Sequence, residues 1–216
     1  MENMAIYSMP RIGDLAPDFK AITTKGPIQF SEFNQGHWVV FFSHPADFTP
    51  VCTTEMSGFA MEQERFFEKR NTKLLGLSID SIHSHIAWVD NVRKNTGVYF
   101  DFPIIADLDM SVSKRYGMLQ PGESETAAVR AVFFIDPAGK IRLIMYYPLS
   151  VGRNMHEIKR ALIALQTNDE HKVALPLNWE PGEKVIVPPP KTLAEYEARL
   201  DSGLEMVDFY LAKKNI

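Results

Sequence analysis

The stretch HWVVFFSHPADFTPVCTTE, residues 37–55, decides the fold. Its first part, His37–Ser43, is a nearly continuous apolar run, which is typical of a central strand covered on both faces. We predict a loop over His44–Val51 and a helix over Thr53–Arg70, where apolar side chains recur near helical spacing. Pro50 suits the very start of that helix. A central strand that leads through a short loop into a helix is typical of an α/β domain.

The same alternation continues along the chain. We predict extended segments over 14–30 with a turn at 25–27, strands at 73–80 and 103–106, helices at 84–94 and 111–116, a hairpin of strands 131–136 and 141–147, and a helix over 155–165. In the helix over 84–94, Ile86 and Val89 are expected on the inner face. This order predicts an α/β, thioredoxin-like fold with a mixed central sheet.

The character of the sequence changes after Asn168. Residues 175–190 are rich in proline, and residues 191–203 read as a charged helix. We therefore expect a thioredoxin-like domain over 1–168 and an extended C-terminal arm over 169–216. The arm is expected to pack on a second subunit and to serve dimerisation.

Composition argues against several classes of function. The chain has 216 residues, 45% of them apolar, which is enough for one well-buried domain. Its net charge of −4, without a basic stripe, speaks against nucleic acid as a partner. Met1–Pro10 lacks the pattern of a signal peptide, and the longest apolar run, Trp38–Phe42, is too short to span a membrane. We therefore expect a cytoplasmic protein without a membrane partner.

Cys52 is the only cysteine, so no intrachain disulfide can form. A lone cysteine is usually a small buried hydrophobe, but this one follows a loop with two prolines at the predicted start of a helix. The unpaired N–H groups and partial positive charge of a helix N-terminus favour a thiolate, which is the nucleophilic form. Thr49 is placed to donate a hydrogen bond to the sulfur or to a bound substrate. Pro45 is placed to keep bulk water away.

Cationic side chains would complete such a site. Arg130 and Arg153 are the candidates to stabilise the thiolate, and Glu55 is the candidate to hold one or both of them by ion pairing. Sequence spacing does not show where these side chains lie in the fold. From spacing alone, such arginines are more often surface cations than members of a site. His83 and His85 are close in sequence, but one cysteine and scattered histidines show no ligand spacing, so we expect no metal site.

Pro45-x-x-x-Thr49-x-x-Cys52 matches the PxxxTxxC motif of the peroxiredoxins, which the chain resembles from about residue 12 to residue 214. The longer HPADFTPVCTTE is similar to the one-cysteine, peroxiredoxin 6-like branch. RAVFFID, which starts at Arg130, resembles the second active-site element of the family. KVIVPPP, residues 184–190, resembles the long C-terminal arm of that branch, which archaeal-type members carry.

The resemblance implies a thiol-dependent peroxidase that reduces hydrogen peroxide and organic hydroperoxides. Cys52 would be the peroxidatic cysteine and form a sulfenic acid, which an external thiol or a redox protein reduces. The other site residues have implied roles too: Thr49 binds the peroxide, Pro45 shields the site, Arg130 stabilises the thiolate and orients the substrate, and His44, Glu55 and Arg153 support them. No cofactor is implied, and the implied assembly is a homodimer that forms decamers.

One departure from the resemblance concerns the tail. Archaeal relatives with a long arm often carry cysteines near the C-terminus, where this chain has Met206 and Ala212. Two explanations stay open at this point. Either the protein works naturally with one cysteine, or Ala212 stands in place of a native resolving cysteine.

Two other classes of function remain as alternatives. A cysteine hydrolase would use His44 or His85 as its base, but no Asp or Asn partner can be placed for either. The phospholipase activity linked to relatives needs a GxSxG serine turn, which this sequence lacks. A non-enzymatic holdase or redox-signalling scaffold would use the Met-rich and aromatic stretches, which are more often ordinary core.

Overall fold

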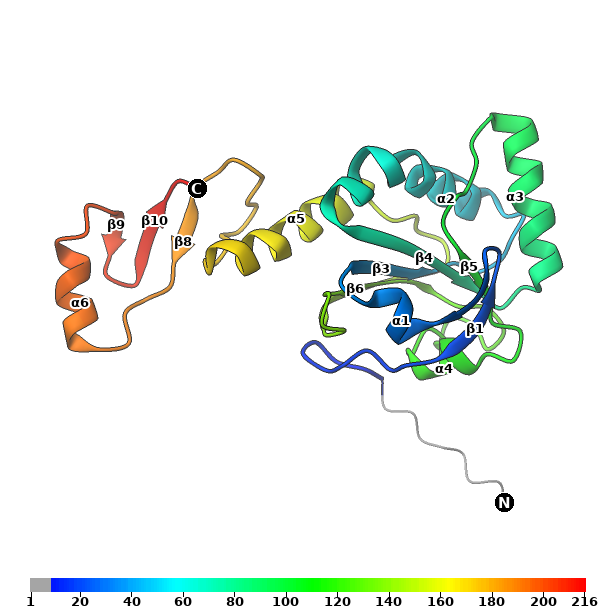
Figure 1. Ribbon diagram of the computed structural model, residues 1–216, viewed down its shortest axis with the longest axis horizontal. Helices are drawn as coiled ribbons and strands as arrows, with labels where there is room; N and C mark the ends of the chain where they lie inside the picture. The colour runs from blue at the N-terminus through cyan, green and yellow to red at the C-terminus, as the bar shows by residue number, and fades with distance from the viewer. Residues whose placement is uncertain (1–8) are drawn as a thin grey trace, which may run out of the picture. The chain divides into compact units, whose positions relative to one another are not determined.

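The computed structural model describes residues 9–216 and divides them into two compact units (Figure 1). The first unit ends at Arg153 and the second begins at Asn154. The sequence places the boundary later, at residue 168, whereas in the structure the helix that follows Asn154 groups with the arm. Most of Met1–Pro10, the segment expected to carry no targeting signal, lies outside the described residues.

The first unit follows the predicted order of strands and helices, with one additional short helix, α1. Its strands are β1 (Lys20–Thr23), β2 (Gly26–Gln29), β3 (Trp38–Ser43), β4 (Thr72–Ser78), β5 (Ile104–Ala106), β6 (Arg130–Ile135) and β7 (Ile141–Tyr147). Its helices are α1 (Phe30–Asn34), α2 (Pro50–Glu62), α3 (Ile82–Thr96) and α4 (Ser111–Arg115).

The seven strands form one mixed sheet in the order β2-β1-β5-β4-β3-β6-β7. The strands β3, β4 and β5 run parallel, and β6 and β7 form an antiparallel hairpin beside β3. This confirms the predicted thioredoxin-like fold. Because β3 and β6 are antiparallel, the end of β3 meets the start of β6, and Ala131 N donates a hydrogen bond to Ser43 Oγ at 3.1 Å. The topology therefore brings Arg130 to the loop that precedes α2.

The strand β3 is covered on both faces, as its apolar run predicts. Residues Val39–Phe42 have no exposed surface. Phe41 packs in one cluster with Tyr116 and Phe133, while Phe42, which points to the other face, stacks on Phe59 of α2 with ring centroids 3.9 Å apart. This stacking fixes α2 against the central strand from which the preceding loop emerges.

The helix α2 begins at Pro50, so the predicted start at Thr53 is wrong by about one turn. Thr49 is the extended N-cap residue, with φ −107° and ψ 148°, and Pro50 occupies the first helical position, where its fixed φ suits the helix. The helix continues through a π-helical turn at Gln63–Phe67 and a 3₁₀ turn at Glu68–Arg70. The predicted end at Arg70 is confirmed.

The inner face of α3 differs from the prediction. His85, Trp88 and Val92 are buried, whereas Ile86 is 53% exposed. Val89 is only partly buried. Ile86 was expected inside because its side chain is apolar. His85 is buried instead because it has polar partners inside the domain.

The second unit has its own small core. It contains the helices α5 (Met155–His171) and α6 (Leu193–Leu200) and the strands β8 (Val185–Val187), β9 (Glu205–Asp208) and β10 (Leu211–Lys214). Val173, Trp179 and Val185 form the buried cluster, and the strands pair in the order β8-β10-β9. The sequence predicted both helices but none of the three strands. No helix within residues 9–216 has the length and apolar character needed to cross a bilayer.

Two substitutions on α3 test its inward face. Val92→Ala removes two buried methyl groups and should lower the free energy of unfolding by about 1.5–3 kcal/mol. Ile86→Ala, on the exposed face of the same helix, should change it by no more than about 0.5 kcal/mol. Chemical denaturation of both variants measures the difference. Equal losses, or a larger loss for Ile86→Ala, would contradict this orientation.

Candidate active site

Cys52 lies in the first turn of α2, as the sequence predicts. The first three helical residues are Pro50, Val51 and Cys52, and the first turn closes through a hydrogen bond from Thr53 N to Thr49 O at 3.0 Å. At this position the partial positive charge of the helix N-terminus favours an anionic sulfur. The Cys52 side chain has no exposed surface.

Arg130 contacts the sulfur directly. Its Nη1 donates to Cys52 Sγ at 3.4 Å and to Glu55 Oε2 at 2.6 Å. Its Nε and Nη2 both donate to Leu149 O, at 2.9 and 2.7 Å. The guanidinium is buried and held from two sides, so its orientation toward the sulfur is fixed. The predicted pairing of Arg130 with Cys52 is therefore present in the structure.

Glu55 joins both predicted arginines. Arg153 donates from its backbone N and from Nε to Glu55 Oε1, at 2.7 and 2.9 Å, and from Nη2 to Oε2 at 2.7 Å. Burial by itself raises the pKa of Glu55, but the charge and hydrogen bonds of Arg153, with the charge of Arg130, outweigh burial and lower that pKa. Glu55 is therefore a carboxylate that holds two buried cations.

Arg153 also ties the site to the central strands. Its Nη1 donates to Ser43 O at 2.9 Å and to Ala131 O at 3.0 Å. Its guanidinium lies over the rings of Phe42 and Phe59, 5.4 and 5.5 Å from their centroids. Such stacking is attractive because the ring faces carry negative charge. Arg153 thus connects the end of β3, the start of β6 and α2.

The loop before α2 carries the other two predicted residues, Thr49 and Pro45. Both are half-buried. Thr49 Oγ1 donates to Ala46 O at 2.9 Å, and no hydrogen bond joins it to the sulfur among the described residues. The hydroxyl oxygen keeps its capacity to accept. Phe48, just before it, is held at φ +56°, a strained conformation for a bulky residue that makes the chain turn sharply before the helix.

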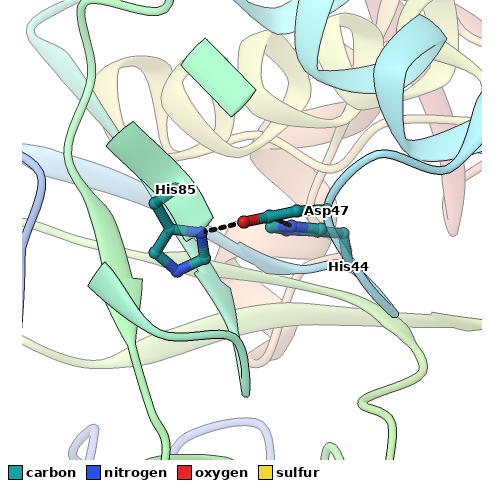
Figure 2. Close-up of side chains that lie close together, drawn as sticks. All are labelled: His44, Asp47 and His85. Carbon is teal, nitrogen blue, oxygen red and sulfur yellow. Dashed lines mark hydrogen bonds and ion pairs between the residues drawn. The ribbon is translucent and has the colours of Figure 1, made fainter. Parts of the chain in front are cut away.

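His44, predicted as a supporting residue, belongs to a separate buried cluster. Its Nε2 lies 2.9 Å from Asp47 Oδ1, and Asp47 Oδ2 lies 2.8 Å from His85 Nδ1 (Figure 2). The expectation that no aspartate partners these histidines is wrong. Neither histidine hydrogen-bonds Cys52 in the described part of the chain, whereas a hydrolase base must reach its nucleophile. Asp47 lies inside the stretch HPADFTPVCTTE but was not identified from the sequence as a partner of either histidine.

His44, Asp47 and His85 also form the single group of three potential metal ligands found among residues 9–216, with ligand atoms within 4.8 Å of one another. The scattered positions of the histidines in the sequence gave no sign of this grouping. In the structure these atoms are engaged with each other and with the Ile105 carbonyl. Their hydrogen bonds therefore explain why they lie together without requiring an ion.

With this geometry in view, comparisons with known proteins define the class. Residues 12–144 match the AhpC/TSA family, and residues 164–203 match the C-terminal domain of 1-Cys peroxiredoxin. The chain belongs to the AhpC/TSA family of peroxiredoxins, which are thiol-dependent peroxidases, and within it to the one-cysteine, peroxiredoxin 6-like branch.

Individual relatives support this placement. The chain is 54% identical to peroxiredoxin 2 of Caldanaerobacter subterraneus subsp. tengcongensis, covering 100% of this chain and 98% of the relative. The solved structure of a yeast mitochondrial 1-Cys peroxiredoxin is 40% identical, with a TM-score of 0.85 and coverage of 96% and 100%. Peroxiredoxin 6 of Arenicola marina, solved as a cysteine-to-serine variant, is 34% identical, with a TM-score of 0.86 and coverage of 95% and 98%.

Replacing Glu55 tests the buried ion pairs. Glu55→Gln leaves two buried guanidinium groups without their carboxylate, and the free energy of unfolding at neutral pH should fall by about 3–5 kcal/mol. The pKa of Glu55 is lower in the folded state than in the unfolded state. Its carboxylate therefore stabilises the fold at pH values above the unfolded-state pKa, and this stabilisation is lost as pH falls. The difference between parent and variant should therefore shrink below about pH 4.3.

Chemical denaturation at a series of pH values measures this difference. Glu64→Gln, an exposed position just beyond α2, is the matched control and should leave stability within about 0.5 kcal/mol of the parent. A loss for Glu55→Gln that stays constant down to acidic pH would show that the charge of Glu55 is not what holds the arginines.

Proposed function

We propose that Cys52 is the peroxidatic cysteine of this thiol-dependent peroxidase and that Arg130, Thr49 and Pro45 complete its catalytic site. The single observation that carries the proposal is the 3.4 Å contact between Arg130 Nη1 and Cys52 Sγ at the start of a helix. A guanidinium and a helix N-terminus both stabilise negative charge on the sulfur. Together they favour a thiolate that is ready to attack.

The proposed reaction forms one bond and breaks one. The Cys52 thiolate attacks the terminal oxygen of a hydroperoxide, an S–O bond forms, and the O–O bond breaks. Cys52 becomes a sulfenic acid, and the leaving alkoxide or hydroxide takes a proton from water to give an alcohol or water. The sulfur loses two electrons, which the peroxide gains. Arg130 stabilises the charge as it moves from sulfur to the peroxide oxygens.

A peroxide can reach the sulfur only if atoms that cover Cys52 move aside. Cys52 has no exposed surface, while Pro45 and Thr49 in the adjoining loop are half-buried. We assign to Thr49 the role of receiving the peroxide and to Pro45 the role of excluding bulk water. Glu55 and Arg153 act by keeping Arg130 in place, and His44 supports the loop that carries Thr49.

Reduction of the sulfenic acid needs a thiol from outside the chain, because Cys52 is the only cysteine. In the yeast mitochondrial relative, the thiol resolving mechanism works via glutathione/thioredoxin systems. We propose a reductant of the same kind, a small thiol or a thioredoxin-type protein, and hydrogen peroxide and organic hydroperoxides as substrates. A peroxidase that depends on reduced thiols suits a reducing compartment, which supports the cytoplasm as its location.

The C-terminal arm is proposed as the dimerisation element, in a homodimer that assembles into decamers. Several apolar side chains of the second unit are strongly exposed, among them Leu177 (91%), Leu193 (80%) and Val207 (77%). Exposed apolar surface of this kind favours burial against a partner. Ala212 is fully buried between β8 and β9, opposite Val187 and Met206.

Cys52→Ser should abolish peroxide consumption and leave the fold intact. Serine is close to cysteine in size, but its hydroxyl does not ionise near neutral pH and is a far weaker nucleophile. A peroxide-consumption assay with an external thiol measures activity, and circular dichroism checks the fold. A folded serine variant that still consumes hydrogen peroxide would sink the assignment of Cys52.

Arg130→Ala should slow the oxidation of Cys52 by about 10²–10³-fold, because the developing charge loses its main hydrogen-bond donor. Alkylation of Cys52 at neutral pH should slow as well, since less thiolate is present. Arg93→Ala, an exposed arginine on α3, is the control and should match the parent. Unchanged oxidation and alkylation in Arg130→Ala would rule out the proposed role of the guanidinium.

A further inference from the structure

The orientation of Arg130 depends on a carbonyl in an irregular turn. Both its Nε and its Nη2 donate to Leu149 O, at 2.9 and 2.7 Å. Leu149 lies just beyond the end of β7, in the turn over residues 148–152. The ladder of the sheet does not extend to this residue, so other contacts must keep the carbonyl in place.

The turn is anchored at both ends. β7 pairs with β6 as far as Tyr147, and after the turn Arg153 N donates to Glu55 Oε1 at 2.7 Å. Within the turn, Val151 N donates to Pro148 O at 3.2 Å. That hydrogen bond closes the turn on itself and does not tie it to the rest of the domain.

Glu123 holds the middle of the turn from outside. Its Oε2 accepts a hydrogen bond from Leu149 N at 3.2 Å. The same residue therefore receives Arg130 at its carbonyl and gives its N–H to a carboxylate, which is a stronger acceptor than a neutral group. Glu123 thus fixes the residue whose carbonyl orients the guanidinium 3.4 Å from Cys52 Sγ.

The loop that carries Glu123 is ordered by its own hydrogen bonds. It lies between α4 and β6, where Glu123 N and Ser124 N donate to Gln120 O at 2.8 and 2.9 Å. Gln120 Nε2 donates to Gly117 O at 2.8 Å. These bonds close a tight turn, so the carboxylate reaches Leu149 from a backbone that is already fixed.

We propose that Glu123 is a positioning residue of the peroxidase: through Leu149 it holds the Arg130 guanidinium against Cys52. This inference rests on the proposed function and extends it to an exposed acid outside the predicted site. In this role Glu123 contacts neither the sulfur nor the peroxide, and no proton or electron passes through it. It acts by keeping one carbonyl in place.

The charge of Glu123 would act in the opposite direction to its hydrogen bond. A negative charge near the site disfavours a thiolate, so removal of the charge alone would favour ionised Cys52 and speed its oxidation. Loss of the hydrogen bond to Leu149 instead frees Arg130 to turn away from the sulfur, which slows oxidation. The sign of the change therefore separates the two effects.

Three variants test the role through the rate constant for oxidation of Cys52 by hydrogen peroxide. Glu123→Ala should lower it about two- to tenfold, the loss expected for one hydrogen bond, and should slow alkylation of Cys52 at neutral pH. Glu123→Gln keeps an acceptor oxygen for Leu149 N and should restore most of the parent rate. Glu125→Ala removes an exposed carboxylate from the same loop and should match the parent.

A double-mutant cycle tests whether Glu123 acts through Arg130. In Arg130→Ala, the further change Glu123→Ala should alter the rate by no more than about twofold, because no guanidinium remains to be positioned. Circular dichroism checks that each variant folds. Amide hydrogen exchange at Leu149 should be slow in the parent and faster in Glu123→Ala, since the N–H loses its acceptor.

The outcomes separate this inference from the proposed function. A parent that does not consume peroxide, or an Arg130→Ala variant that is oxidised like the parent, would contradict the proposed function itself. With both as expected, an unchanged or faster rate in Glu123→Ala would overturn the positioning role. So would a Glu123→Gln variant as slow as Glu123→Ala, or an equal loss in the Arg130→Ala background. If Glu123→Ala does not fold, the parent decides: a protected Leu149 amide supports the role, and rapid exchange overturns it.

Discussion

The site depends on one buried carboxylate. Glu55 receives hydrogen bonds from both Arg130 and Arg153, and each arginine is further bound to backbone carbonyls of other segments. Without that carboxylate, two cations would be buried side by side with no counter-charge. With it, one guanidinium lies 3.4 Å from the sulfur of Cys52 and has little freedom to move away. Fold and chemistry are therefore coupled through this residue.

Much of the fold could be predicted from the sequence, and the errors have physical causes. The apolar run of β3 needed cover on both faces, and the structure provides it. The start of α2 was placed too late, at Thr53, although Pro50 suits the first position of a helix, because Thr49 was not identified as the N-cap residue. The tail strands β9 and β10 were missed because they are short and contain exposed charged residues, so their sequences show little alternation of apolar and polar side chains.

Site residues that lie close together in the sequence could be predicted from it. Contacts between residues far apart in the sequence could not, except where the resemblance supplied the residue. The helix start marks Cys52 and Thr49, and the resemblance assigns Arg130, but no spacing rule relates Asp47 to His85 across intervening elements. A signal was available: His85, Trp88 and Val92 share one helical face, so the apolar residues of that face place the histidine inside. A buried histidine must have polar partners, and Asp47 was the unassigned acid in the neighbouring loop.

The central claim is that the helix end and the Arg130 guanidinium keep the sulfur of Cys52 ionised. The most direct test is the ultraviolet absorbance of the thiolate in the reduced protein, titrated with pH against Cys52→Ser as the blank. The account predicts a thiolate signal that is already substantial at neutral pH and that persists below the range in which a free cysteine ionises, about pH 8.5. A signal that emerges only in alkaline solution would contradict it.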